Sequence, residues 1–168
     1  MPITRLTPRH AGVYRALMLE AYERHPEAFA SSAAERAALP LVWWKNRLLE
    51  GDAAGQVVFG AFAETELAGV AGLRFESREK EHHKATLFGM YVRERFRGEG
   101  LGRQLVEAVL DHARGRPETL LVQLTVIETN THARRLYEAC GFTAFGTEPL
   151  AVHVGAEYLA KVHMWCEL

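Results

Sequence analysis

Apolar residues follow two patterns along this chain, and the first of them predicts β-strands. Two long runs carry apolar residues on both alternating sets of positions, residues 56–63 and 119–127, and two further long runs, residues 67–75 and 82–92, are also expected to be strands. A strand that is covered on both faces has this character, whereas a half-exposed strand alternates between apolar and polar residues. We therefore expect residues 56–63 to be a strand that is covered on both faces and residues 119–127 to be a central strand of the sheet. Shorter strands are expected at the remaining apolar runs: residues 2–7, 142–147 and 158–166.

The second pattern, apolar residues spaced three and four positions apart, predicts helices. It occurs in four segments: residues 8–22, 40–49, 101–113 and 131–140. Proline begins the first two, and glycine follows shortly after the last two, as is common at helix starts and stops. Segment 27–39 is expected to be broken and partly helical. It either forms a wall of a substrate site or only covers the sheet.

The order of these elements predicts an α/β (α+β) fold. Strands 56–63 and 67–75 are typical of a hairpin with a polar tip at 64–66, and residues 148–157 are expected to be an irregular connection between the last two strands. The sheet is thus built mostly from hairpins, with helices on both faces. A length of 168 residues, 48% of them hydrophobic, predicts a single domain over residues 1–168.

Composition narrows the classes of partner. A formal net charge of −1 gives no global attraction to nucleic acid or to an anionic membrane. The N-terminus has no signal-peptide pattern, and no apolar run approaches the roughly 20 residues of a spanning helix. Cys140 and Cys166 suggest neither a disulfide framework nor a metal site. We expect a cytoplasmic protein with no metal and no nucleic-acid or membrane partner.

A glycine-rich stretch between strand 82–92 and helix 101–113 predicts an anion-binding site. Gly98, Gly100 and Gly102 stand at alternate positions there, and glycine lets a ligand approach the main chain closely. The first N–H groups of the following helix lack partners within the helix, and its dipole favours negative charge. Residues 93–103 also hold four arginines against two glutamates. A phosphate or pyrophosphate is the ligand that such a loop favours.

Two common nucleotide-binding loops do not fit this stretch. A phosphate-gripping P-loop needs Lys followed by Ser or Thr after its last glycine, and Arg103-Gln104 stands here instead. A dinucleotide fingerprint needs Gly-x-Gly-x-x-Gly near the first strand–helix turn. This loop reads Gly-x-Gly-x-Gly and lies in the middle of the chain.

The loop does match Arg/Gln-x-x-Gly-x-Gly, filled by Arg97, Gly100 and Gly102, and a second motif follows it. Residues 130–142 fit Asn-x-x-Ala-x-x-Leu-Tyr-x-x-x-Gly-Phe. With both motifs in this order, separated by one helix and one strand, the chain resembles the GNAT superfamily of acetyl-CoA-dependent N-acetyltransferases. The resemblance implies a mixed, mostly antiparallel sheet of six to seven strands that splays between its fourth and fifth strands, with acetyl-CoA in the opening.

The resemblance also implies roles for individual residues. The residues expected to bind acetyl-CoA are Met90, Tyr91, Val92, Arg97, Gly98, Glu99, Gly100, Leu101, Gly102, Arg103, Asn130 and Ala133. Backbone N–H groups of residues 90–92 would hold pantetheine and polarise the thioester carbonyl, and residues 97–103 would bind pyrophosphate. Asn130 would contact pantetheine, besides being a plausible helix N-cap. Tyr137 would donate a proton to the sulfur.

The group that deprotonates the amine is less narrowly defined. A primary amine is mostly protonated at neutral pH, so a carboxylate, a histidine or ordered water must take up a proton. Glu128, just after strand 119–127, is our catalytic candidate because it follows the strand expected to lie near the thioester. The other options that remain open are His82, His83, Glu35 and Glu76.

These observations predict an N-acetyltransferase that moves an acetyl group directly from acetyl-CoA to a primary amine. The neutral net charge gives no sign of a basic peptide partner, so we favour a small-molecule or amino-acid-like acceptor. The alternatives are a protein N-terminal or lysine acetyltransferase and a non-catalytic acyl-CoA-binding homologue. A homodimer is possible because the C-terminal strands are apolar and could pair across a two-fold axis.

Overall fold

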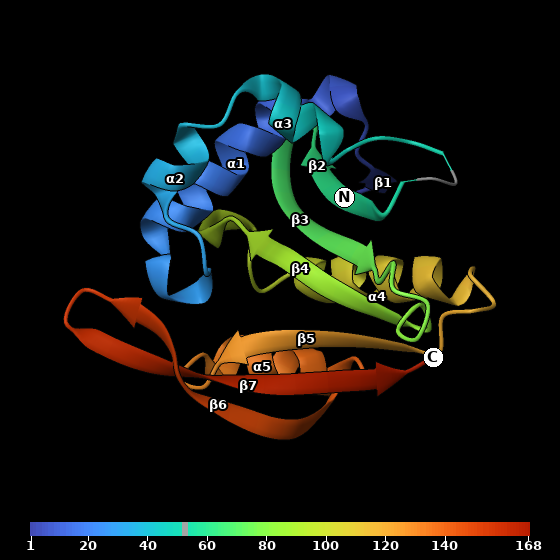
Figure 1. Cartoon of the computed structure of the whole chain (residues 1–168). Coiled ribbons are helices and arrows are strands. Elements are labelled where there is room, and N and C mark those ends of the chain that lie inside the picture. Colours follow the sequence, from blue (N-terminus) through green and yellow to red (C-terminus); the bar gives the residue numbers. More distant parts are fainter. Residues whose placement is uncertain (52–53) are drawn as a thin grey trace.

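The computed structural model describes residues 1–51 and 54–168 and is organised around one seven-stranded sheet (Figure 1). The strand order is β1-β2-β3-β4-β5-β7-β6, and every neighbouring pair is antiparallel except β4 and β5. The strands are β1 (Ile3–Arg5), β2 (Gln56–Ala63), β3 (Glu66–Phe75), β4 (Lys84–Val92), β5 (Leu121–Ile127), β6 (Thr143–Val154) and β7 (Glu157–Glu167). This confirms the predicted fold class, a mixed and mostly antiparallel sheet.

Helices cover both faces of the sheet, and each face has its own core. The helices are α1 (Ala11–Arg24), α2 (Ala33–Ala37), α3 (Leu41–Asn46), α4 (Leu101–Arg114) and α5 (Thr131–Ala139), with short 3-10 turns η1 (Pro8–His10), η2 (Pro26–Ala28) and η3 (Glu94–Phe96). Residues of α4 and α5 pack in a core that includes strands β2 to β5 and β7. Residues of α1 and α3 pack in a second core, which takes its strand residues from β2, β3 and β4. Among the described residues, that second core has no member from β5, β6 or β7.

The strands β4 and β5 form the parallel pair, and they stay together for only part of their length. Their ladder joins Lys84 to Leu121 and ends where Thr86 faces Gln123. Both strands continue well beyond that point, to Val92 and Ile127, and in Figure 1 they diverge toward the left of the molecule. The sheet therefore splays between its fourth and fifth strands, as the resemblance implied.

A bulge bends β4 on the free side of this fork. Gly72 of β3 faces Phe88, whereas Val70 faces Tyr91, so two residues of β4 lie opposite Ala71. A bulge leaves its extra residue out of the ladder and turns the strand. The backbone of residues 89–90 is thereby released at the point where β4 leaves β5.

One segment was predicted wrongly. Residues 148–157 are not an irregular connection: β6 continues to Val154, and β6 and β7 form one long hairpin in which Val154 pairs with Glu157. The register shifts between Glu148 and Val152, so the irregularity is a bulge within the hairpin. Pro149 is compatible with a strand here because β6 lies at the edge of the sheet.

Some boundaries also differ from the prediction, although each element exists. Strand β4 begins at Lys84 rather than residue 82, β5 begins at Leu121, and α3 ends at Asn46. Among the described helices, none has the length and apolar character needed to cross a membrane.

Candidate active site

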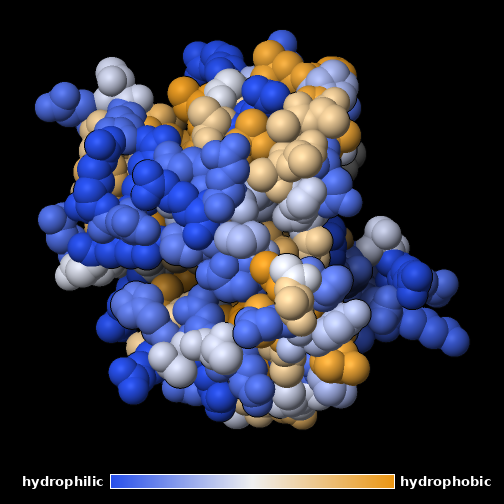
Figure 2. All heavy atoms as spheres, turned by 90° about the vertical axis from the view of Figure 1, so that its left-hand side faces the viewer, coloured by the Kyte–Doolittle hydropathy of each residue, from blue (hydrophilic) through white to orange (hydrophobic). Residues whose placement is uncertain are grey.

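A large cleft lies at the fork between β4 and β5. Its volume is about 1110 Å³, slightly above the roughly 300–1,000 Å³ that is typical of small-molecule sites. Figure 2 shows the left-hand side of Figure 1, where a hollow between the two halves of the molecule exposes apolar atoms beside hydrophilic ones. The cleft is lined by both halves of the fork, by the glycine loop and by the turn η2.

The glycine loop has the backbone geometry that an anion site requires. Gly98 and Gly100 have φ values of +87° and +77°, in the left-handed region that favours glycine, and no atom lies within 4 Å of where a Cβ would be. Gly100 is the N-cap of α4 and provides no side-chain cap. The first N–H groups of this 14-residue helix therefore face the cleft without a partner from the helix itself. The loop fits a pyrophosphate on these grounds.

The arginines near the loop divide into two groups. Arg93 and Arg95 are bound by Glu66, and Arg93 is also bound by Glu20, so their charge is neutralised outside the cleft. Arg97 and Arg103 line the cleft. Of the four arginines counted over residues 93–103, only Arg97 and Arg103 therefore contribute positive charge to the cleft.

Arg97 and Arg103 are each held in place by contacts with other residues. Arg97 donates from Nε to the carbonyl of Val92 at 2.8 Å, and its Nη2 lies 3.3 Å from Nε2 of His25. Arg103 donates to Glu107 one turn further along α4 at 2.7 Å, which raises the pKa of its guanidinium. Both arginines are therefore positioned beside the N-terminus of α4 before any ligand binds.

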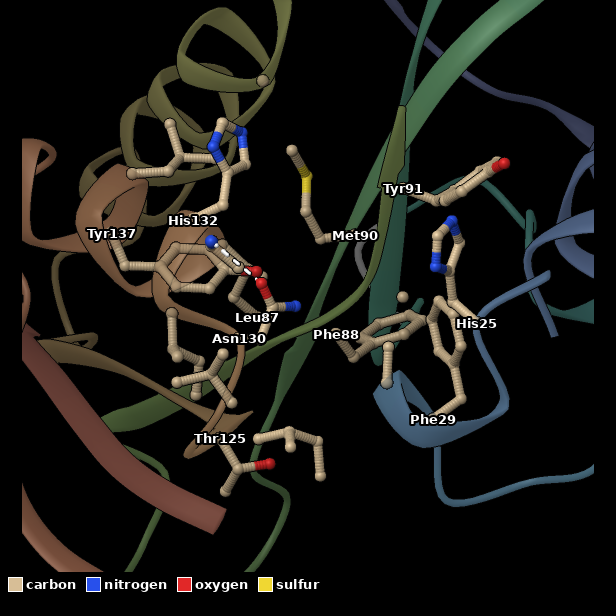
Figure 3. Close-up of a pocket in the computed structure, with 18 of the residues that line it drawn as sticks. His25, Phe29, Leu87, Phe88, Met90, Tyr91, Thr125, Asn130, His132 and Tyr137 are labelled. Carbon is tan, nitrogen blue, oxygen red and sulfur yellow. Dashed lines mark hydrogen bonds between the residues drawn. The ribbon is translucent and has the colours of Figure 1, made fainter. Parts of the chain in front are cut away.

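The end of β4 runs through the middle of the cleft. Met90, Tyr91 and Val92 all line it, and in Figure 3 the side chain of Met90 lies between the two walls. The bulge at residues 89–90 interrupts pairing with β3 at this point, so backbone N–H groups there are available to a ligand in the cleft.

Asn130 and Ala133 lie at the N-terminus of α5 and line the opposite wall. Asn130 is the N-cap, as predicted, and its Oδ1 accepts a hydrogen bond from the N–H of Ala133 at 3.1 Å (Figure 3). The N–H of Ala133 is thereby occupied. A ligand in the cleft would instead meet the amide nitrogen of Asn130, which can donate two hydrogen bonds.

Tyr137 lies about one turn beyond Ala133 along α5 and also lines the cleft. Its side chain is only 6% exposed and packs edge-on against Phe142, with ring centroids 5.9 Å apart. Burial, with a smaller contribution from nearby Cys140, raises the pKa of its phenol above the usual value. The hydroxyl therefore keeps its proton throughout the neutral pH range.

The wall that faces α5 is aromatic. Phe88 comes from β4, and His25 and Phe29 flank the turn η2; these three side chains lie across the cleft from Asn130 and Tyr137 (Figure 3). Phe29 packs edge-on against Tyr22 of α1 at 5.0 Å. The segment after α1 therefore does form a wall of the cleft, whereas α1 and α3 cover the sheet.

Strand alternation defines the face of the sheet on which each cleft residue lies. Val122, Leu124, Val126 and Val162 belong to the core beneath α4 and α5, so the residues between them point to the opposite face. We call this opposite side the acceptor face. Its cleft residues are Thr86, Phe88, Gln123, Thr125, Lys161 and His163.

A chain of hydrogen bonds crosses the acceptor face where the fork closes. The hydroxyl of Thr86 donates to Oε1 of Glu76 at 3.2 Å, and Nε2 of Gln123 donates to the same hydroxyl at 3.4 Å. Arg74 lies 4.0 Å from the same carboxylate oxygen. Glu76 lines the cleft and its side chain is 26% exposed, so the chain holds one carboxylate at the base of the fork.

The structure brings most of the sequence-predicted site residues together, with two exceptions. Met90 to Val92, Arg97, Gly98, Gly100 to Arg103, Asn130, Ala133 and Tyr137 all line the cleft. The side chains of Glu99 and Glu128 are exposed and are not part of its lining. Glu128 lies beyond the end of β5, where its N–H donates to the carbonyl of Ala160.

The other candidates for the group that deprotonates the amine also divide into residues that line the cleft and residues that do not. His82 and His83 lie in the turn before β4, and Glu35 caps α2 by accepting from the N–H of Ser32. That hydrogen bond lowers the pKa of Glu35. None of these three lines the cleft. Glu76 is the one option of the sequence analysis that does.

Several cleft residues were missed by reasoning from the sequence. Arg135 lines the cleft, although in the sequence it is not distinguished from Arg134, which pairs with Glu138 at 3.1 Å. Lys161 and His163 also line it, and strand alternation opposite Ile127 and Thr125 was the available signal for them. That signal required the pairing register of β5 with β7, which the sequence does not provide.

Comparison with known proteins identifies a family and several proteins that this chain resembles. The family model described as "Acetyltransferase (GNAT) family" matches residues 12–142. The chain is 28% identical over 93 residues to a spermine/spermidine N(1)-acetyltransferase of Bacillus subtilis, covering 55% of this chain and 54% of that protein. It is 36% identical over 118 residues to N-alpha-acetyltransferase 40 of Saccharomyces cerevisiae, covering 60% of this chain and 41% of that protein. The chain thus spans about half the length of the curated relatives it matches.

Solved structures share the whole fold. One is a protein from Salmonella typhimurium described "with its cofactor Acetyl-CoA"; it superposes with a TM-score of 0.81 and 20% identity, covering 99% of this chain and 93% of that one. At this identity the likeness shows the fold alone.

Proposed function

Since the chain belongs to the GNAT family of acetyltransferases, we propose that it transfers an acetyl group directly from acetyl-CoA to a primary amine of a small, amino-acid-like molecule. One observation carries the proposal. The glycine loop, the end of β4, Tyr137 and a carboxylate, Glu76, all open into the same cleft. Acetyl-CoA supplies the activated acetyl group as a thioester.

The acyl donor would be bound along one side of the fork. The N–H groups at the start of α4, with Arg97 and Arg103, would hold its pyrophosphate, since charge-assisted hydrogen bonds are the strong ones. The amide of Asn130 and the backbone of residues 90–92 would hold pantetheine. The bulge supports this assignment because it interrupts the β3–β4 ladder at those residues.

The reaction would balance as follows. The ammonium of the acceptor gives one proton to a base, and the free amine nitrogen then attacks the carbonyl carbon of the thioester. A carbon–nitrogen bond forms, the carbon–sulfur bond breaks, and the sulfur leaves with the electron pair and takes up a proton. The nitrogen loses its second proton, so the products are an N-acetylated amine and free CoA thiol.

We propose Glu76 as the base in place of Glu128. Glu76 lies in the cleft, and the Thr86 hydroxyl donates to one of its oxygens, which orients the carboxylate. Glu128 is exposed outside the cleft lining. A base has to come within hydrogen-bond reach of the proton that it removes, so geometry favours Glu76.

Tyr137 would act on the leaving sulfur through its O–H group. Its pKa is raised, whereas that of a thiol is near 8.5, so complete transfer of the phenolic proton to a thiolate is uphill. A hydrogen bond from the hydroxyl to the sulfur as negative charge develops needs no such transfer. We therefore propose Tyr137 as a hydrogen-bond donor in the transition state, with the final proton of the thiol coming from the acceptor by way of solvent.

The test is turnover of the purified protein with acetyl-CoA and a panel of amines, followed by release of CoA thiol. We expect at least one small primary amine to be acetylated. Binding of acetyl-CoA without thiol release above the no-acceptor rate, across small amines and peptides, would instead identify a non-catalytic acyl-CoA-binding homologue.

A second candidate acceptor is a protein N-terminus. Its support is the similarity to N-alpha-acetyltransferase 40, together with the exposure of Phe145 (60%) and Trp165 (38%) on the strands beside the cleft. Peptides that carry a free N-terminus belong in the same panel. Faster turnover of peptides than of every small amine would favour this candidate.

A further inference from the structure

The acceptor face carries charges of both signs around the part of the cleft that remains for the amine. Glu76 lies at the closed end of the fork and Glu27 lies on the turn η2, while Arg74 and Lys161 line the same cleft. Turn η2 contacts both β5 and β6, so it lies across this face and limits the space between these groups.

Lys161 differs from the other charged residues of this face. Glu148, which is its register partner across β6 and β7, binds His163 instead, with Oε2 3.0 Å from Nε2. Throughout residues 1–51 and 54–168, no carboxylate lies within ion-pair distance of Lys161. The residue is half-buried and lines the cleft. An ammonium that lines the cleft and has no carboxylate partner among the described residues can form charge-assisted hydrogen bonds with an anionic group of a ligand.

The spacing along β5 suits a small acceptor between Glu76 and Lys161. Glu76 is linked to Gln123, and Lys161 faces Ile127. Four residues of strand span about 13 Å, with Thr125 midway, and Glu76 and Lys161 both line the cleft along this interval. A compact molecule with an amine at one end and an anion at the other can therefore contact both.

The same charges disfavour an acceptor that is cationic along its length. A polyamine would place ammonium groups not only near Glu76 and Glu27 but also near Lys161, which has no carboxylate partner among the described residues, and like charges at short range repel. The relative from Bacillus subtilis is named for spermine and spermidine. The acceptor face of this chain fits a different acceptor chemistry.

We propose that Lys161 binds the carboxylate of the acceptor, and that the acceptor is a free amino acid whose amine is directed toward Glu76. The proposal rests on the proposed function and defines its substrate class. Lys161 acts here as a specificity residue, because it contacts the non-reacting end of the substrate.

The experiment compares free L-amino acids, the corresponding amino-acid amides, spermidine, and peptides with an acidic second residue, each with acetyl-CoA and the full chain. Wild type is expected to favour an amino acid over its amide by at least about tenfold in kcat/KM, the usual range for a hydrogen bond to a charged group. Lys161→Met should remove most of that preference, because kcat/KM for the amino acid should fall by a larger factor than kcat/KM for the amide, which has no carboxylate for Lys161 to bind. Lys161→Arg should retain the preference. Lys80→Met, in an exposed turn outside the cleft, is the matched control.

The possible outcomes are distinct. Equal use of acid and amide by the wild-type protein, or an equal loss on both in Lys161→Met, would overturn the proposal and leave the proposed function intact. Preferred turnover of spermidine would overturn the inference together with the amino-acid-like acceptor, and would leave only acetyl transfer to a primary amine. Preference for the acidic peptides over every free amino acid would show that Lys161 binds the side-chain carboxylate of a protein acceptor. That result would overturn the choice of a free amino acid. Absence of turnover with every amine would overturn the proposed function and the inference with it.

Discussion

At the scale of single residues, removal of the Tyr137 hydroxyl is the most direct test of the proposed hydrogen bond to the leaving sulfur. Tyr137→Phe deletes one oxygen and keeps the ring that packs against Phe142. Loss of a hydrogen-bond donor to the developing charge should lower kcat by about 100-fold. The affinity for acetyl-CoA, measured by calorimetry, should change little because the ring still fills its place.

The matching control is Tyr158→Phe, which removes the same oxygen from a side chain that is 60% exposed on β7 and stacks on His153. Its kcat should equal that of the wild-type protein. Unchanged turnover in Tyr137→Phe as well would remove Tyr137 from the mechanism.

Gly100 allows a test of the anion site through the backbone. A Cβ at Gly100 meets no neighbour, so Gly100→Ala adds only the cost of a left-handed φ of +77°, about 1–2 kcal/mol of folding free energy. Gly100→Glu adds a negative charge beside the phosphate site and should abolish acetyl-CoA binding. Denaturant unfolding and calorimetry separate the two effects.

Gly12 provides the control for this pair. It lies in α1 with ordinary φ and open space around its Cβ position, so Gly12→Ala should stabilise the fold by up to about 1 kcal/mol. Wild-type affinity for acetyl-CoA in Gly100→Glu would contradict the pyrophosphate assignment.

Residue types and spacing were sufficient to find one side of the site. The glycines around Gly100 and the N-cap Asn130 depend on local backbone geometry, which the sequence specifies directly. Glu76 and Lys161 depend on which strands lie side by side and in what register. A shift of one residue in the pairing of β5 and β7 would move Lys161 to the other face, so no local pattern could distinguish it from other charged residues.

At the scale of elements, the turn η2 borders the acceptor side of the cleft and contacts β5 and β6. It follows the C-terminus of α1 and is anchored by Phe29 against Tyr22. Phe29→Ala should release this anchor and raise the KM for the acceptor by about tenfold, the equivalent of roughly 1.4 kcal/mol of lost contact. The Kd for acetyl-CoA, measured by calorimetry, should stay within error because the glycine loop is untouched.

Val42→Ala, at a position of α3 that is 58% exposed, is a control for the loss of apolar surface near the N-terminus. A parallel rise in the acceptor KM and the acetyl-CoA Kd in Phe29→Ala would show that η2 supports the whole cleft rather than one side of it.

The long elements were predictable because their pattern is repeated many times over. Helix α4 has six buried apolar residues on one face, and β3 is buried at most of its positions. The hairpin of β6 and β7 was harder, because Pro149 and Gly155 indicate breaks in the sequence, while edge pairing tolerates the proline and the glycine forms the turn. An edge strand can only be recognised once the sheet order is known.

For the whole molecule, the unequal covering of the sheet explains where the cleft lies. Strands β2 to β4 are packed on both faces, whereas β5, β7 and β6 contribute to the core beneath α4 and α5 alone. The two halves are joined by a short parallel ladder that ends at Thr86 and Gln123. A ligand can therefore enter between two well-packed halves without the loss of core contacts.

The stability of this arrangement should depend on pH through His112 of α4. Its ring lies against Phe59 and Phe75, with centroids 5.6 and 6.0 Å away. Burial lowers the pKa of His112, and the positive charges of Arg5 and Arg116 lower it further. The folded state thus favours the neutral ring, so the unfolded state binds more protons in the interval just below the ordinary value near 6.5. The contribution to stability is complete above that value and is lost as the pH falls through and below it.

His112→Phe keeps an aromatic ring between these neighbours but cannot be protonated. In urea unfolding at pH 7.5 and pH 5.5, the fall in unfolding free energy should therefore be smaller in His112→Phe than in the wild-type protein. His153→Phe, at an exposed position of β6, should keep the wild-type difference, because acidic residues elsewhere affect all three proteins alike. An equal fall in His112→Phe and the wild-type protein would show that protonation of this histidine does not weaken the packing of α4 on the sheet.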